Sequence, residues 1–145
     1  MGYSWRWNYK PSWTCHIFFE TMIKWAKGES FALSKNFNVA EFTCKCKTEF
    51  CKASFISLRL IQLIQKTREV LGVSLRINSG YRCQVHNARI GGKNLSYHIL
   101  GQAADLACPS NMTFDTFLTI IEEMGFDKVI PYENENFVHV AVIIL

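Results

Sequence analysis

The sequence predicts a single α+β domain with a small, mainly antiparallel sheet and helices packed against it. A chain of 145 residues is long enough for one hydrophobic core, and 49% hydrophobic against 19% charged residues is typical of a folded globular protein. Helical and strand-like stretches follow one another without strict alternation, which favours α+β over a doubly wound sheet. We divide the chain into an N-terminal segment, residues 1–30, and a domain, residues 31–145.

The N-terminal segment is distinguished by its aromatic content, because it holds all four tryptophans of the chain. Ile17 to Ala26 is a possible short helix, and we assign the segment no function. Charged residues interrupt its apolar runs: Arg6, Lys10, Glu20 and Lys24. We therefore expect neither a secretory signal peptide nor a membrane span.

In the first half of the domain, apolar residues at helical spacing predict a long helix from Ser54 to Leu71. Ser54 is suited to cap this helix and Gly72 to end it. A short strand is expected over Val73–Asn78. After a turn, a second helix is expected from Cys83 towards Ile90.

In the second half, Ala103–Ala107 has the composition of a buried strand. A helix is predicted over Thr113–Met124, followed by strands over Lys128–Pro131 and Phe137–Ile144. The polar, Asn-rich stretch Tyr132–Asn136 is suited to a loop between these strands. We expect helices to cover one face of the sheet and a metal site to lie at one of its edges.

The cysteines offer a less specific pattern. Cys44, Cys46 and Cys51 form one compact group, whereas Cys15, Cys83 and Cys108 are scattered. Structural zinc sites usually contain two pairs of closely spaced cysteines. We therefore interpret the group as buried or free thiols, with a second zinc site or disulfides as the alternatives.

The net charge of +4 is spread along the chain. It favours anionic partners such as cell-wall polymers over nucleic acid, which basic clusters recognise.

A candidate metal site lies in the stretch Ser96–Asp105, which has the pattern S-x-H-x-x-G-x-A-x-D. His98 and Asp105 are separated by small residues that leave space for a crowded site, and a carboxylate in a buried strand requires a cation or hydrogen bonds. His139 interrupts an apolar strand and also requires a partner. Two histidines and one carboxylate form a known catalytic zinc set that leaves a position open for water.

Several motifs occur in the same order as in a known family. They are Glu41-Phe42, Ile77-Asn78-Ser79-Gly80-Tyr81-Arg82, His86-Asn87 followed by Gly91-Gly92, Ser96–Asp105 and Phe137-Val138-His139-Val140. Over residues 31–142 the chain resembles the zinc D-alanyl-D-alanine carboxypeptidases and related phage lysins and murein endopeptidases, which share a fold with the hedgehog signalling domain. The resemblance implies that His98, Asp105 and His139 bind Zn²⁺.

The resemblance also places Arg82 beside the substrate. A guanidinium there can hold a carboxylate or carbonyl oxygen and stabilise charge that builds on it. A structural ion pair is the alternative for Arg82. Ser96 is suited either to bind substrate or to steady the turn, and we favour the turn. His86 and Asn87 are interpreted as mainly structural, with support of a residue that binds the metal as the alternative for His86.

A carboxylate is needed to relay a proton, and the candidates are Glu133 and Glu135. On a straight strand Glu135 would lie about 13 Å from His139, so a turn is required to bring either carboxylate close. Tyr132-Glu133 resembles the Tyr-Glu pair of the hedgehog domain, whereas many of the peptidases place glutamate where this chain has Asn136. We favour Glu133.

The resemblance implies a zinc peptidase that hydrolyses D-Ala-containing stem peptides or cross-links of peptidoglycan through a metal-activated water. We expect a monomer with a peptidoglycan peptide as its partner, no nucleic acid and, for a phage-type enzyme, a cytoplasmic location before release. The alternative is an inactive, zinc-containing binding module. Ala141, where many relatives have an acidic residue, and the chain end at Leu145 favour that alternative.

Overall fold

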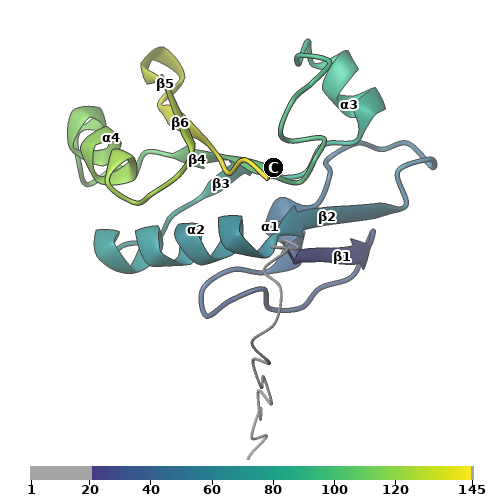
Figure 1. Cartoon of the computed structure of the whole chain (residues 1–145), viewed down its shortest axis with the longest axis horizontal. Coiled ribbons are helices and arrows are strands. Elements are labelled where there is room, and N and C mark those ends of the chain that lie inside the picture. Colours follow the sequence, from purple (N-terminus) through teal and green to yellow (C-terminus); the bar gives the residue numbers. More distant parts are fainter. Residues whose placement is uncertain (1–20, 145) are drawn as a thin grey trace, which may run out of the picture.

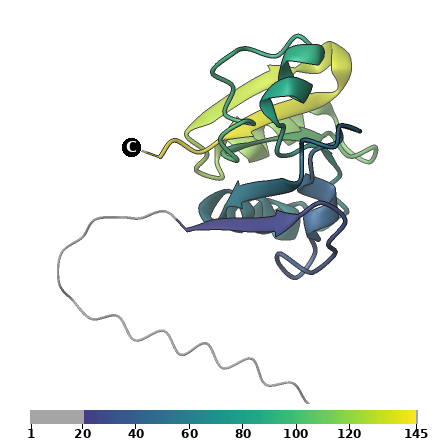
Figure 2. The same ribbon diagram turned by 90° about the vertical axis from the view of Figure 1, so that its right-hand side faces the viewer.

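The computed structural model describes residues 21–144, which form two layers (Figures 1 and 2). One layer holds a two-stranded sheet and a long helix, and the other holds a four-stranded sheet with two further helices. All strand pairs are antiparallel. The α+β class predicted from the sequence is confirmed. None of the helices within the described residues is long and apolar enough to cross a lipid bilayer.

The two-stranded sheet pairs β1 (Met22–Ala26) with β2 (Ala53–Ser57). The possible helix ending at Ala26 is therefore wrong for residues 22–26, and residues 17–20 lie outside the described part of the chain. Trp25 is only 2% exposed and its indole Nε1 donates to Thr43 Oγ1 at 2.7 Å. This part of the N-terminal segment is thus built into the domain core, whereas Trp5, Trp7 and Trp13 are not among the described residues.

The long helix α2 spans Leu58–Leu71 and starts four residues later than predicted. Its N-cap is Ser57, whose side chain accepts the backbone N–H of Leu60 at 3.1 Å. Ser54 lies instead in β2, because pairing with β1 overrides the local helical pattern. The predicted end is correct, since Gly72 adopts the left-handed conformation (φ 67°) and its N–H bonds the carbonyl of Arg68.

The larger sheet has the strand order β3-β4-β6-β5. Its strands are β3 (Ile77–Ser79), β4 (Ala103–Ala107), β5 (Lys128–Tyr132) and β6 (Phe137–Ala141). The predictions for β4 and β5 are right to within a residue. β6 ends three residues earlier than predicted, and β3 is shorter and shifted towards Ser79.

One face of this sheet forms the main core. Alternate residues of the two central strands, Ala104 and Leu106 of β4 and Val138 and Val140 of β6, are fully buried. They belong to the same cluster as the apolar faces of α2 and of α4 (Phe114–Glu122), the helix predicted near Thr113–Met124. Figure 1 shows α2 running along the underside of this sheet. The intervening residues of β4 and β6 therefore project to the opposite face.

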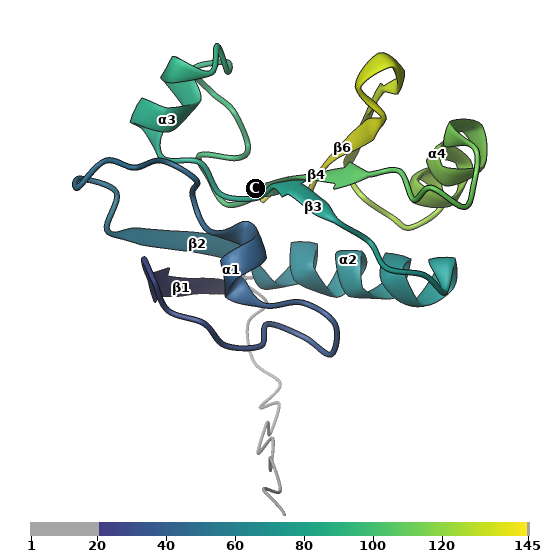
Figure 3. The same cartoon turned by 180° about the vertical axis from the view of Figure 1, so that it is seen from behind.

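Two short helices lie next to the segment that follows β3. In α1 (Val39–Phe42), Asn38 and Glu41 form a capping box, and the Phe42 carbonyl accepts the N–H of Tyr81 at 2.9 Å. This contact joins α1 to the segment after β3, and the two elements are adjacent in Figure 3. The second short helix, α3 (Gln84–Arg89), was predicted from the sequence and is capped by Cys83.

Candidate metal centre

Asp105 and His139 are brought together by strand register. They lie directly opposite one another on β4 and β6, with both side chains on the face turned away from the core. Because β4 and β6 are the two central strands, the site lies over the middle of the sheet. The prediction that it lies at an edge is therefore wrong. The strand order depends on contacts between distant segments, which local sequence patterns do not reveal.

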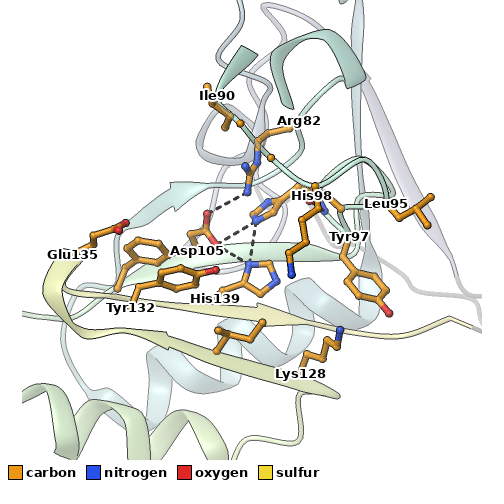
Figure 4. A pocket seen from close by; sticks show the side chains of 16 residues that line it. Arg82, Ile90, Leu95, Tyr97, His98, Asp105, Lys128, Tyr132, Glu135 and His139 are labelled. Carbon is orange, nitrogen blue, oxygen red and sulfur yellow. Dashed lines mark hydrogen bonds and ion pairs between the residues drawn. The ribbon is translucent and has the colours of Figure 1, made fainter. Parts of the chain in front are cut away.

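His98 reaches the same point from the turn before β4. His98 Nε2 lies 3.2 Å from Asp105 Oδ1 and 3.1 Å from His139 Nδ1, and the latter two atoms are 2.8 Å apart. Figure 4 shows the three side chains converging. The three residues that the sequence singled out as metal ligands therefore form one compact group.

The spacing of this group fits a zinc ion. Ligand atoms about 2.0–2.1 Å from a tetrahedral zinc are separated from one another by about 3.3 Å, close to the observed distances. His98 Nδ1 lies 2.7 Å from the carbonyl oxygen of Gly80, which can only accept, so Nδ1 donates to it and Nε2 is the ring atom that faces the group.

The backbone around His98 explains two glycines of the sequence motifs. A Cβ on Gly80 would lie 2.6 Å from Phe42 Cα, so only glycine allows the approach that presents its carbonyl to His98. Gly101 has φ 67°, and a Cβ there would lie 2.6 Å from the Phe55 carbonyl oxygen. The tight turn at Gly101 brings His98 and Asp105, seven residues apart, to one point.

Ser96 lies in the same turn, and its Oγ accepts the N–H of His98 at 3.3 Å. Asn87 is 2% exposed and donates to the Lys93 carbonyl, while its side chain fills the space that a Cβ on Gly92 would need. This packing gives a structural reason for the Asn87 and Gly92 positions of the motif.

Electrostatic interactions hold Asp105 in its charged form. Burial acts to raise the pKa of Asp105, but the hydrogen bonds with His139 and His98 outweigh it and hold the pKa well below its usual range. Arg82 Nη2 lies 3.4 Å from the second carboxylate oxygen, Oδ2, with both side chains largely buried. Asp105 is therefore a carboxylate at neutral pH, as a metal ligand must be.

Arg82 is fixed through its backbone as well, since its N–H donates to the His98 carbonyl at 3.2 Å. Burial lowers the pKa of Arg82 and the neighbouring Asp105 opposes this shift. Among the described residues, no acceptor bonds the buried Nε of Arg82. The ion pair considered from the sequence is thus present, and Arg82 also lines the pocket.

The group lies in a pocket of about 430 Å³, a size suited to a small ligand or a peptide end. Three basic side chains, Arg82, Lys93 and Lys128, line it together with one acidic side chain besides Asp105, that of Glu135. Lys128 Nζ lies 5.0 Å from the centre of the Tyr97 ring. The lining therefore carries one more basic than acidic side chain, and Lys93 and Lys128 have no acidic partner among the ion pairs found in the described residues.

A model of a protein family described as Peptidase M15 matches residues 35–141. The chain belongs to this family. Its members are metallopeptidases, so the resemblance inferred from the motifs is confirmed at the level of the family and of the reaction class. A comparison with curated proteins found no match to this chain.

In this M15 metallopeptidase, the turn predicted before His139 is present. Glu133–Glu135 form a 3-10 helix, η1, and Asn136 follows in the left-handed conformation (φ 56°) that asparagine tolerates. Glu135 is among the residues that line the pocket and Glu133 is not. In Figure 4, Glu135 lies on the opposite side of Asp105 from His98.

Several pocket residues of the M15 peptidase were not singled out from the sequence. Tyr97 precedes His98 in the metal motif, a position that marks it as a neighbour of the site. Lys93 and Lys128 carried no such signal, because Lys128 enters the pocket only through the pairing of β5 with β6. Cys83 was also missed as a partner of the other cysteines.

Proposed function

We propose that the chain is a zinc-dependent peptidase that hydrolyses peptide bonds of bacterial peptidoglycan. The observation that carries the proposal is the convergence of His98 Nε2, Asp105 Oδ1 and His139 Nδ1 within 3.2 Å of one another in a pocket. These three atoms would hold the ion. When bound, zinc supplies a Lewis acid that polarises the scissile carbonyl and lowers the pKa of a water molecule towards neutrality.

The charge of the pocket supports an anionic peptide as substrate. Stem peptides of peptidoglycan carry free carboxylates, which the basic side chains of Arg82, Lys93 and Lys128 can attract. Together with the motif resemblance, this supports a peptide with a D-alanine residue at or near the bond that is cleaved.

Arg82 is suited to two tasks in this reaction. Its contact with Asp105 Oδ2 orients the metal-binding carboxylate, and its position in the pocket wall allows it to stabilise negative charge on a substrate oxygen. A second carboxylate transfers a proton from the attacking water to the leaving amine. The sequence favoured Glu133 for this task, but the lining of the pocket favours Glu135.

The test is to incubate the purified chain with stem peptides of defined sequence, both linear and cross-linked, and to analyse the products by mass spectrometry. We expect cleavage next to D-alanine, loss of cleavage with a chelator and recovery when zinc is added back. Release of a terminal residue would identify a carboxypeptidase, and cleavage of the cross-link an endopeptidase. Binding of these peptides without cleavage would instead support the alternative of an inactive binding module, which the presence of Ala141 favours. If the chain neither binds nor cleaves these peptides, the proposed substrate is refuted.

A further inference from the structure

A second group of metal-binding side chains lies outside the pocket. Cys44 and Cys46 follow α1, Cys51 precedes β2 and Cys83 caps α3. The four Sγ atoms all lie within 4.8 Å of one another. Cys83, which is scattered in the sequence, is thus the fourth member of the compact group Cys44, Cys46 and Cys51.

We propose that Cys44, Cys46, Cys51 and Cys83 bind a structural zinc ion, which joins the two layers of the fold next to Arg82.

The distances fit a single ion coordinated by four thiolates. With Zn–S bonds of about 2.3 Å, sulfur atoms at the corners of a tetrahedron are about 3.8 Å apart. The Sγ atoms of Cys46 and Cys83 lie 3.7 Å apart. A disulfide requires about 2.05 Å, and all four cysteines are free in the structure. An iron–sulfur cluster would hold the cysteines farther apart, because iron and sulfide atoms lie between them.

Hydrophobic packing does not explain why the four thiols converge. Cys44, Cys46 and Cys51 form a small buried cluster separate from the main core, and its partly buried neighbours are Cys83 and Tyr81, with no aliphatic side chain among them. The connecting residues 43–52 form neither helix nor strand. Phe50 in this loop is 91% exposed. A loop with so little apolar burial needs another constraint, and a shared metal ion supplies one.

The surroundings of the sulfur atoms suit thiolates. The backbone N–H of Cys83 donates to Cys44 Sγ at 3.3 Å, and that of His86 donates to Cys83 Sγ at 3.4 Å. Lys27 Nζ lies 3.6 Å from Cys46 Sγ. Four thiolates and one Zn²⁺ carry a net charge of about −2, which N–H donors and an ammonium group stabilise.

The position of this cluster links it to the metallopeptidase site. Cys44, Cys46 and Cys51 belong to the α1–β2 connection, whereas Cys83 directly follows Arg82 in the chain. An ion shared by these four residues would fix the backbone at Arg82 relative to α1. The expected role is positioning, because the cysteine site does not line the pocket.

The test is the metal content of the full chain, purified under reducing conditions in the presence of zinc. We expect two zinc ions per chain by elemental analysis. The variant Cys46→Ser/Cys83→Ser should lose one of them, and His98→Ala should lose the other. The control Cys108→Ser removes a thiol outside the cluster and should keep both.

Cobalt distinguishes the two sites even if the cysteine variant fails to fold. His98→Ala loaded with Co²⁺ should show the near-ultraviolet charge-transfer absorption of cobalt thiolates, which histidine and aspartate ligands do not produce. A wild-type chain with a single zinc that His98→Ala removes would overturn the proposal. So would a disulfide among the four cysteines, or iron in place of zinc. Neither measurement depends on peptidase activity, so failure of the proposed function leaves this test intact.

Discussion

Arg82→Lys isolates what the guanidinium contributes, because it keeps the positive charge and changes only reach and geometry. Arg82 Nη2 lies 3.4 Å from Asp105 Oδ2. A lysine Nζ on the same path occupies the place of the guanidinium carbon, about 1.3 Å short of Nη2. The ammonium group therefore lies about 1.3 Å farther from Asp105, and from any substrate oxygen that Nη2 would contact.

This extra distance sets the expected loss of peptidase activity. Lengthening a charge–charge distance from about 3.4 to about 4.7 Å weakens the attraction by about 1.4 kcal/mol at an effective dielectric constant of about 20. Applied to charge that develops on the substrate oxygen, that energy corresponds to about tenfold in rate. Lysine also lacks the second N–H group that the guanidinium can present to the same oxygen, which adds to the loss. We therefore expect kcat/KM to fall by about 10- to 100-fold. Removing the charge in Arg82→Met should cost more, about 10²- to 10³-fold.

The assay is hydrolysis of the stem peptide on which the wild-type chain is active, with zinc content measured on the same samples. Arg59→Lys is the matched control, because Arg59 forms an ion pair with Asp127 at 2.7 Å outside the pocket. It should leave turnover unchanged. Arg82→Lys should keep its zinc.

Two results would refute this reasoning. Wild-type turnover by Arg82→Lys would show that Arg82 acts only as a structural cation. A loss of zinc from Arg82→Lys as large as that from a ligand variant would show that Arg82 acts on metal binding and not on the substrate.

Three further predictions concern other residues. His98→Ala should abolish hydrolysis and remove the zinc of the pocket, as judged by elemental analysis, and a variant that keeps both would exclude His98 as a ligand. Glu135→Gln should keep zinc and lose turnover while Glu133→Gln keeps both; the reverse pattern would restore Glu133 as the base, and normal turnover in both variants would exclude the pair. The hydrogen bond from Arg59 lowers the pKa of Asp127. The ionised Asp127 side chain therefore stabilises the fold above about pH 4, and this stabilisation is lost as the pH falls through the lowered pKa. Asp127→Asn should reduce the free energy of unfolding by about 0.5–1 kcal/mol at pH 7, and the difference from wild type should shrink in urea titrations as the pH falls below about 4; a difference that does not shrink with falling pH would exclude the ion pair as its cause.

Much of the fold was predictable because its signals are local. The helix α4 and the end of α2 depend on capping residues within a few positions of each helix end. The strand β4 was predicted with its observed bounds from a short buried run of small and apolar residues. β2 was not, since its five residues continue the apolar pattern of α2 and become a strand only by pairing with β1.

The candidate site divides in the same way. The sequence by itself identified the family and three candidate metal ligands, because His98, Asp105 and His139 are polar residues in settings that require a partner and lie in the motifs of the family. Only the tertiary structure decided that the site lies over the central strands and that Glu135, not Glu133, lines the pocket. It also decided that Cys83 joins the other cysteines. Each of these outcomes depends on contacts between segments far apart in the chain, which the periodicity and capping signals of a single segment do not contain.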